Sequence, residues 1–245
     1  MAQWHDHEFE HLDAETRDRV SMGYVKTVLT FVIYDAFLLV LAGGNIVSVA
    51  QDRSGIIFED SLRNHLESGW FWVREDPAAH RFTGEALELQ TRLGTLWGVT
   101  NTAKNILLRT PPERPGGFSV EVTLRSDPAI DGEQAGLIIY WSDRDYIKLV
   151  KEFKGKPQVI FVREQDDKPV VIATADCPAG AVALSMVVSR GRVKARFRAD
   201  HDPKWHLMGE CDPLQEPPSV GLFTHVWPGA SERWAKFSTF CIRSG

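Results

Sequence analysis

The stretch from Glu133 to Lys154, EQAGLIIYWSDRDYIKLVKEFK, has the pattern of one complete β-hairpin. Successive strand residues point to opposite faces of a sheet, so the pattern predicts two strands joined by a polar turn at residues 142–145. One predicted face is apolar and carries Leu137, Ile139, Ile147 and Leu149. The other face carries an aromatic ring, a cation and a carboxylate, at Tyr140, Lys148 and Glu152. That mixture is typical of a sugar-binding sheet face, although a solvated sheet surface has a similar composition.

The composition of the 245-residue chain bounds its class and its partners. A hydrophobic content of 43% is ample for a packed core, in one large β-sandwich or two small domains. The formal net charge of -5 provides no overall basic field, which disfavours nucleic acid as a partner. Cys177, Cys211 and Cys241 are odd in number and widely spaced, so they fit neither a disulfide framework nor a zinc site. We expect no metal ion and no other cofactor.

From Ile56 to the C-terminus, short strands alternate with turn residues, which predicts an all-β domain of the sandwich or barrel type. Residues 118–125 and 192–198 each alternate apolar with polar side chains, so each predicted strand has a core side and a wet side. Turn residues mark positions 115–117, 131–132, 166–169 and 190–191. We therefore predict a leader over residues 1–55 and one β-sandwich over residues 56–245.

The leader contains an apolar run from Val28 to Ala50. Together with a short basic start after Met22 and the small residues at 48–50, this run resembles an export signal. Asp35 interrupts the run, and a charge at the centre of a membrane helix costs about 2.5 to 3.5 kcal/mol. A helix or strand packed on the domain is the alternative. Exported or periplasmic and cytoplasmic locations are thus about equally expected, and a membrane contact is expected only if residues 28–50 act as an anchor.

Four segments after residue 55 carry a family resemblance. They are IIFEDSLRNHLESGWFWVRED at 56–76, TNTAKNILLR at 100–109, the hairpin EQAGLIIY...YIKLVKE, and GLFTHVW...AKFSTFCI at 221–242. In order and spacing they resemble the concanavalin A-like domain at the C-terminal end of family 43 β-xylosidases, and small stand-alone proteins of the enolase-regulating type. The resemblance implies a jelly-roll sandwich of two antiparallel sheets, one of them concave, without a catalytic propeller domain.

The resemblance and the hairpin pattern together predict a ligand face along the concave sheet. Its residues are Trp72, Arg74, Tyr140, Lys148 and Glu152, with His225 and Trp227 from a late loop at the rim. Aromatic rings stack on the C–H faces of sugars, while charged side chains bond their hydroxyls. In the alternative, Trp72 and Tyr140 fill the core edge, and Lys148 and Glu152 form a cross-strand pair worth roughly 0.2 to 1 kcal/mol.

A catalytic alternative requires two carboxylates about 5 to 5.5 Å apart for retaining glycoside hydrolysis, or farther apart for inversion. Several sandwich-fold glucanases carry E-x-D-x-x-E on one strand. The nearest match here begins at Glu164, but Pro169 replaces the third acid and residues 166–169 have the pattern of a turn. Glu121 and Glu152 are a second pair that can meet if their strands are adjacent, one of them acting as general acid. No nucleophile elbow and no phosphate-binding glycine loop is present in the sequence.

The sequence therefore favours a noncatalytic β-sandwich module that binds carbohydrate or a sugar-like ligand. One alternative is a glycoside hydrolase or polysaccharide lyase with carboxylates on the concave sheet. Another is a cytoplasmic protein-interaction or regulatory module. No pattern indicates the oligomeric state.

Overall fold

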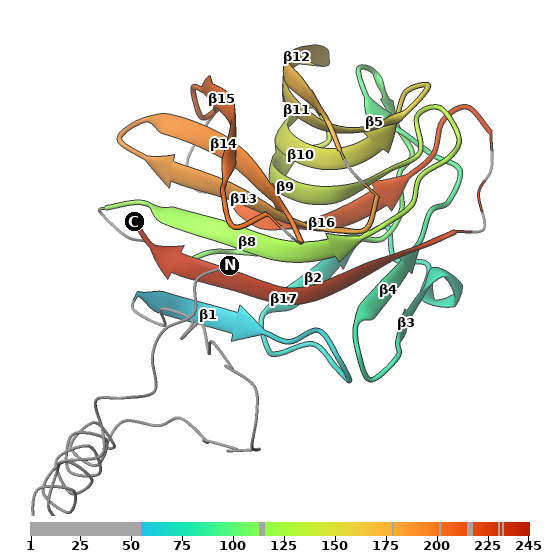
Figure 1. The fold of residues 1–245 in the computed structure, drawn as a ribbon, viewed down its shortest axis with the longest axis horizontal. Coiled ribbons are helices and arrows are strands. Elements are labelled where there is room, and N and C mark those ends of the chain that lie inside the picture. The colour runs from blue at the N-terminus through green and yellow to red at the C-terminus, as the bar shows by residue number, and fades with distance from the viewer. Residues whose placement is uncertain are drawn as a thin grey trace, which may run out of the picture. The chain divides into compact units, whose positions relative to one another are not determined.

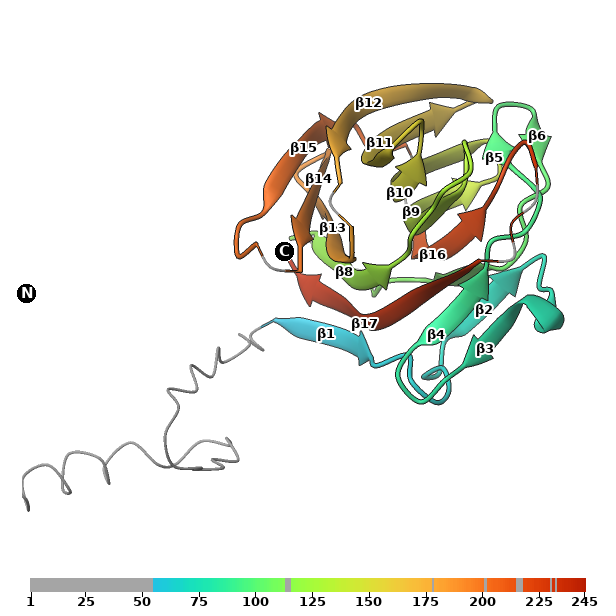
Figure 2. The same cartoon turned by 45° about the vertical axis from the view of Figure 1, so that its right-hand side comes forward.

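The computed structural model describes residues 55–112, 116–177, 179–200, 202–214, 218–229, 231 and 233–245. Within these residues two large antiparallel sheets pack face to face, as Figures 1 and 2 show. The predicted all-β sandwich is confirmed. The apolar run Val28–Ala50 and the candidate export signal lie outside the described residues. Among the described residues, no helix is long and apolar enough to span a membrane.

The first sheet consists of β1 (Ile56–Asp60), β3 (His80–Phe82), β4 (Leu87–Gln90), β8 (Phe118–Arg125), β13 (Ala181–Ser189), β14 (Arg192–Ala199), β15 (His206–Cys211) and β17 (Trp234–Ser244). Its strand order is β15-β14-β13-β8-β17-β4-β3, and β1 pairs with the C-terminal part of β17. The first and last strands of the sandwich therefore lie side by side (Figure 1).

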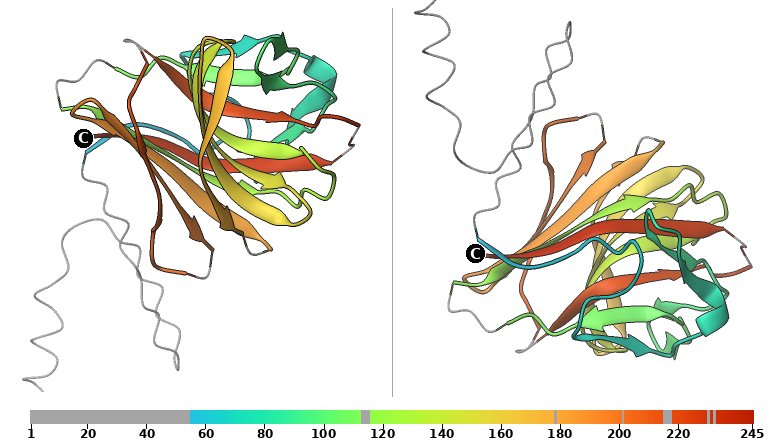
Figure 3. Two further views of the ribbon diagram at one scale, coloured as in Figure 1. Left: turned by 90° about the horizontal axis from the view of Figure 1, so that it is seen from above. Right: turned by 90° about the horizontal axis from the view of Figure 1, so that it is seen from below.

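The second sheet consists of β2 (Trp70–Val73), β7 (Ile106–Arg109), β9 (Gln134–Ser142), β10 (Asp145–Phe153), β11 (Pro157–Gln165), β12 (Lys168–Asp176) and β16 (Ser219–His225). Its strand order is β12-β11-β10-β9-β16-β7-β2. The hairpin predicted from residues 133–154 is β9 and β10, and it lies in the middle of this sheet. Figure 3 shows how these strands curve. The remaining elements are β5 (Leu96–Trp97), β6 (Thr100–Asn101) and the short 3-10 helix η1 (Pro77–Ala79).

The core lies between the two sheets and is built by alternating side chains from both. In β8, buried and half-buried residues alternate as predicted, with Val120 and Val122 fully buried. The apolar face of the hairpin, which includes Leu137 and Leu149, belongs to the same cluster. Burying one such side chain is worth about 1.5 to 3 kcal/mol, so the period-two pattern fixes which face of each strand points inward.

The opposite face of the second sheet, which we call the outer face, is only partly open. Residues 93–104, here called the β5–β6 loop, fold over it. Leu96 and Ala103 from this loop pack against Ile138, Val150 and Phe223 of the sheet in a second apolar cluster. The outer face is therefore divided into a covered centre and open margins.

Two glycines allow neighbouring strands of the second sheet to approach closely. A Cβ atom at Gly136 would lie 2.2 Å from the carbonyl oxygen of Leu149, and one at Gly221 would lie 1.8 Å from that of Leu107. Both contacts are far inside van der Waals distance, so only glycine fits. These positions lie in β9 and β16, the strands that also carry part of the candidate site.

Candidate functional site

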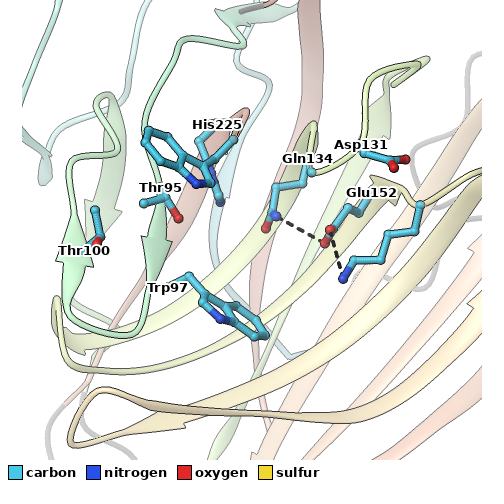
Figure 4. Close-up of a pocket in the computed structure, with 10 residues that line it drawn as sticks. Thr95, Trp97, Thr100, Asp131, Gln134, Glu152 and His225 are labelled. Atoms are coloured by element: carbon cyan, nitrogen blue, oxygen red, sulfur yellow. Dashed lines mark hydrogen bonds and ion pairs between the residues drawn. The ribbon is translucent and has the colours of Figure 1, made fainter. Parts of the chain in front are cut away.

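A pocket of about 530 Å³ opens on the outer face of the second sheet, beside the β5–β6 loop (Figure 4). Adjacent strands supply its floor. Gln134 begins β9 and pairs with Glu152 of β10 on one side and with His225 of β16 on the other. Because directly paired residues project to the same face, the register brings these three side chains together.

Two tryptophans contribute to the walls of the pocket. Trp97 comes from the β5–β6 loop and is 42% exposed, and Trp227 follows β16 and is 51% exposed. Thr95, Asp131 and Lys154 also line the pocket. Exposed tryptophan is costly unless it has a partner, so two half-exposed indoles on one pocket favour a ligand with apolar faces.

Glu152 is the buried carboxylate of the floor. The amide nitrogen of Gln134 donates to Glu152 Oε2 at 3.2 Å, and the ammonium of Lys154 lies 3.8 Å from Oε1. Burial raises the pKa of Glu152 above its usual range, while Lys148 and Lys154 act in the opposite direction.

His225 and Gln134 each hold an acceptor without a partner. Nδ1 of His225 lies 3.0 Å from the carbonyl oxygen of Gly94, so this nitrogen carries the proton and donates. Burial, with a smaller contribution from Lys148, lowers the pKa of His225 to about 3, and the ring is neutral at physiological pH. Nε2 of His225 and Oε1 of Gln134 are buried and have no hydrogen-bond partner in the described part of the chain. Buried acceptors of this kind are rare unless a ligand or a water molecule completes them.

Lys148 lies on the outer face, as predicted, but it is fully buried beneath the β5–β6 loop. Its ammonium donates to the carbonyl oxygen of Leu96 at 3.2 Å and lies 5.3 Å from the ring centroid of Trp97. Burial lowers its pKa to about 8. Lys148 and Glu152 belong to the same strand, so the cross-strand pair considered above is wrong. Lys148 supports the loop rather than lining the pocket.

The prediction that Trp72 lies on the ligand face is wrong. Trp72 pairs with Leu107 and packs against the core between the sheets, where its ring stacks on that of His80 with centroids 4.6 Å apart. The neighbouring Phe71, of opposite parity, points to the outer face and is 44% exposed. The sequence W-F-W in β2 offers an aromatic residue to each face, and only the pairing with β7 decides between them.

Arg74 and Tyr140 meet each other but not the pocket. The guanidinium of Arg74 donates two hydrogen bonds to Asp143, at 2.6 and 2.8 Å, and the hydroxyl of Tyr140 donates to the same carboxylate at 2.9 Å. Tyr140 lies on the predicted face, but it is six residues from Gln134, or about 20 Å along the strand. The cluster therefore ties the end of β2 to the β9–β10 turn.

Neither carboxylate pair considered for catalysis forms. Glu121 lies on β8 of the first sheet, opposite Ser185 and Cys241, whereas Glu152 lies on β10 of the second, so the condition that their strands be adjacent is not met. Asp166 and Asp167 form the turn between β11 and β12 with φ of 53° and 62°, as their turn pattern predicted. In the described residues, no group of three or more His, Cys, Asp or Glu side chains is arranged to hold a metal ion.

Three of the seven predicted site residues, Glu152, His225 and Trp227, thus line the pocket together. His225 lies at the end of a strand and is buried, not in a rim loop as expected. Gln134 and Trp97 were missed. The hairpin alternation puts Gln134 on the same face as Tyr140, so its parity was a usable signal. Trp97 reaches the pocket through a loop, for which periodicity gives no signal.

Comparison with known proteins agrees with this architecture. Residues 60–243 match the family described as the beta xylosidase C-terminal concanavalin A-like domain. The GH43 protein BlXynB from Bacillus licheniformis is 22% identical with a TM-score of 0.66, and the match covers 82% of this chain and 41% of that protein. Xylan beta-1,4-xylosidase from Bacillus halodurans is 18% identical with a TM-score of 0.66, covering 76% and 39%. A functionally unknown protein from Saccharomyces cerevisiae is 17% identical with a TM-score of 0.59, covering 73% and 97%.

These structural likenesses, all under 25% identity, show the fold. The chain spans only about two fifths of the two bacterial proteins. No curated protein sequence matches it significantly. The resemblance to enolase-regulating proteins stays a prediction. Since the family match extends over most of the chain, from β1 to β17, the chain belongs to the family of beta xylosidase C-terminal concanavalin A-like domains.

Proposed function

We propose that this domain is a noncatalytic module that binds carbohydrate in the pocket lined by Trp97 and Trp227. The observation that carries the proposal is the combination of two half-exposed indoles with buried acceptors that have no partner among the residues that the structure describes. Sugars have apolar C–H faces that stack on aromatic rings and hydroxyls that donate hydrogen bonds. The pocket offers a surface for each.

The comparisons support this proposal at the level of ligand class. The matched xylosidase is named for action on xylan, a carbohydrate. A module of the same family that binds such a polymer is chemically consistent with the pocket, although fold alone is a weak argument for function.

The hydrolase or lyase alternative has less support. Of the described residues that line the pocket, two carry carboxylates: Glu152 is buried, and Asp131 is exposed and accepts a hydrogen bond from the backbone N–H of Gly155 at 2.9 Å. Two carboxylates facing each other across the scissile bond are the usual requirement. The protein-interaction alternative stays a prediction.

A titration with neutral oligosaccharides tests the proposal. The purified full chain should bind xylo- or gluco-oligosaccharides in isothermal titration calorimetry, because sugar rings displace water from the two indoles. Trp97→Ala and Trp227→Ala should each weaken binding about fivefold to tenfold, the value of one aromatic contact of about 1 kcal/mol or slightly more.

The matched control is Trp205→Ala, since Trp205 packs against Arg196 and Arg198 rather than the pocket. It should leave affinity unchanged. Absence of binding to every oligosaccharide by the unmodified chain would refute the proposal, and a search for protein partners would then follow.

A further inference from the structure

We infer that the pocket selects an uncharged sugar ring that donates hydroxyl hydrogens to both His225 Nε2 and Gln134 Oε1, and that it discriminates against uronic acids. This inference rests on the proposed function and adds the class of sugar. It follows from which hydrogen-bond donors and acceptors of the pocket floor already have partners within the protein and which do not.

The two floor atoms that have no partner among the described residues are both acceptors. His225 is 3% exposed and Gln134 is 5% exposed; Nδ1 of His225 donates to the Gly94 carbonyl, and one N–H of the Gln134 amide donates to Glu152. Nε2 and Oε1 have no partner among the described residues. A ligand completes these positions only by donating, and hydroxyl groups are the donors that every neutral sugar carries.

The two acceptors are placed for one ligand. Gln134 and His225 are directly paired residues of β9 and β16. Directly opposite residues have Cβ atoms about 4.5 to 5.5 Å apart, a spacing that one sugar ring or two adjacent rings can bridge. A ligand that lacks these donors leaves both acceptors buried and unpaired, which is the strongest form of polar discrimination.

The charges of the lining disfavour an anionic sugar. Asp131 and Glu152 contribute two carboxylates and Lys154 one ammonium, which is exposed and already lies 3.8 Å from Glu152. The second nearby ammonium, that of Lys148, is held under the loop by the Leu96 carbonyl. A uronate carboxylate accepts hydrogen bonds and cannot donate them, and in the pocket it would lie near the carboxylates of Asp131 and Glu152.

The test compares hexasaccharides of equal length on the full chain by calorimetry, at one fixed ionic strength and neutral pH. The probes are xylohexaose, cellohexaose and an oligogalacturonate hexamer. At least one neutral hexamer should bind 10-fold or more tightly than the oligogalacturonate, a ratio of about 1.4 kcal/mol. Equal or tighter binding of the oligogalacturonate overturns the inference while carbohydrate binding stands. Absence of binding to all three removes the proposed function itself.

Two shape-conserving variants test the acceptors directly. Gln134→Met and His225→Phe remove one acceptor each, and each should weaken binding of the neutral hexamer about threefold to tenfold. The matched controls Gln165→Met and His206→Phe change exposed side chains that do not line the pocket, and they should bind as the unmodified chain does. Unchanged affinity in both acceptor variants overturns the inference. The hexamer comparison uses only the unmodified chain and decides the matter even if a variant fails to fold.

Discussion

At the residue scale, His225 couples the pocket to acid stability. Its pKa is lowered by burial to about 3, so below pH 6.5 the unfolded chain binds a proton that the folded chain does not. As the pH is lowered from 6.5 towards 3, the free energy of unfolding should therefore decrease. The expected decrease between pH 7 and pH 5 is about 2 kcal/mol. His225→Phe should lack this component. Denaturant melts of both proteins at pH 7, 6 and 5 measure it, and parallel pH curves would contradict it.

Lys148 should have the corresponding effect at alkaline pH. Burial lowers its pKa from 10.5 to about 8, so between pH 8 and 10.5 the unfolded chain holds a proton that the folded chain has released. The free energy of unfolding should rise across this window by about 3 kcal/mol relative to Lys148→Met. The difference between the two proteins cancels the titration of other groups. A difference that stays constant from pH 8 to 10 would show that Lys148 keeps its usual pKa.

At the element scale, the β5–β6 loop depends on contacts with β10 and β11. The hydroxyl of Tyr146 lies 2.5 Å from the Leu96 carbonyl and also contacts Glu164, whose carboxylate accepts from the N–H of Gly98 at 3.2 Å. Tyr146→Phe should cost about 1 to 3 kcal/mol, because it leaves buried partners unsatisfied. Hydrogen exchange over residues 93–104 should become faster. Tyr140→Phe is the control, since the Tyr140 hydroxyl donates to Asp143 near the β9–β10 turn, away from the β5–β6 loop; equal exchange in both variants would contradict this role.

At the scale of the whole molecule, one core joins the two sheets. Phe161 of β11 is fully buried in it, whereas Phe71 on the outer face is 44% exposed. Phe161→Ala should reduce the free energy of unfolding by about 3 to 5 kcal/mol, and Phe71→Ala by less than about 1 kcal/mol. Chemical denaturation followed by circular dichroism measures both. A similar loss in the two variants would mean that the sheets do not share one cooperative core.

Local alternation of apolar and polar residues predicted part of this fold. Alternation in the 133–154 hairpin, in β8 and in β14 predicted the strands, their inward faces and the sandwich, because a period of two is imposed by the backbone itself. The same alternation predicted that Glu152 lies on the face of the sheet that carries the pocket. Alternation did not predict the order of the strands, so it left open whether Glu121 and Glu152 lie on adjacent strands, and the structure places them on different sheets.

The all-β class, the family resemblance and the two faces of the central hairpin can be predicted from the sequence, because each follows from patterns among residues close in the chain. Three features depend on the folded domain: Trp72 faces the core, the β5–β6 loop buries Lys148, and Trp97 joins Gln134, Glu152 and His225 in one pocket. Each of these depends on a pairing register or a loop path between segments far apart in sequence. The free energy that selects them comes from packing across the whole domain, which no local pattern records.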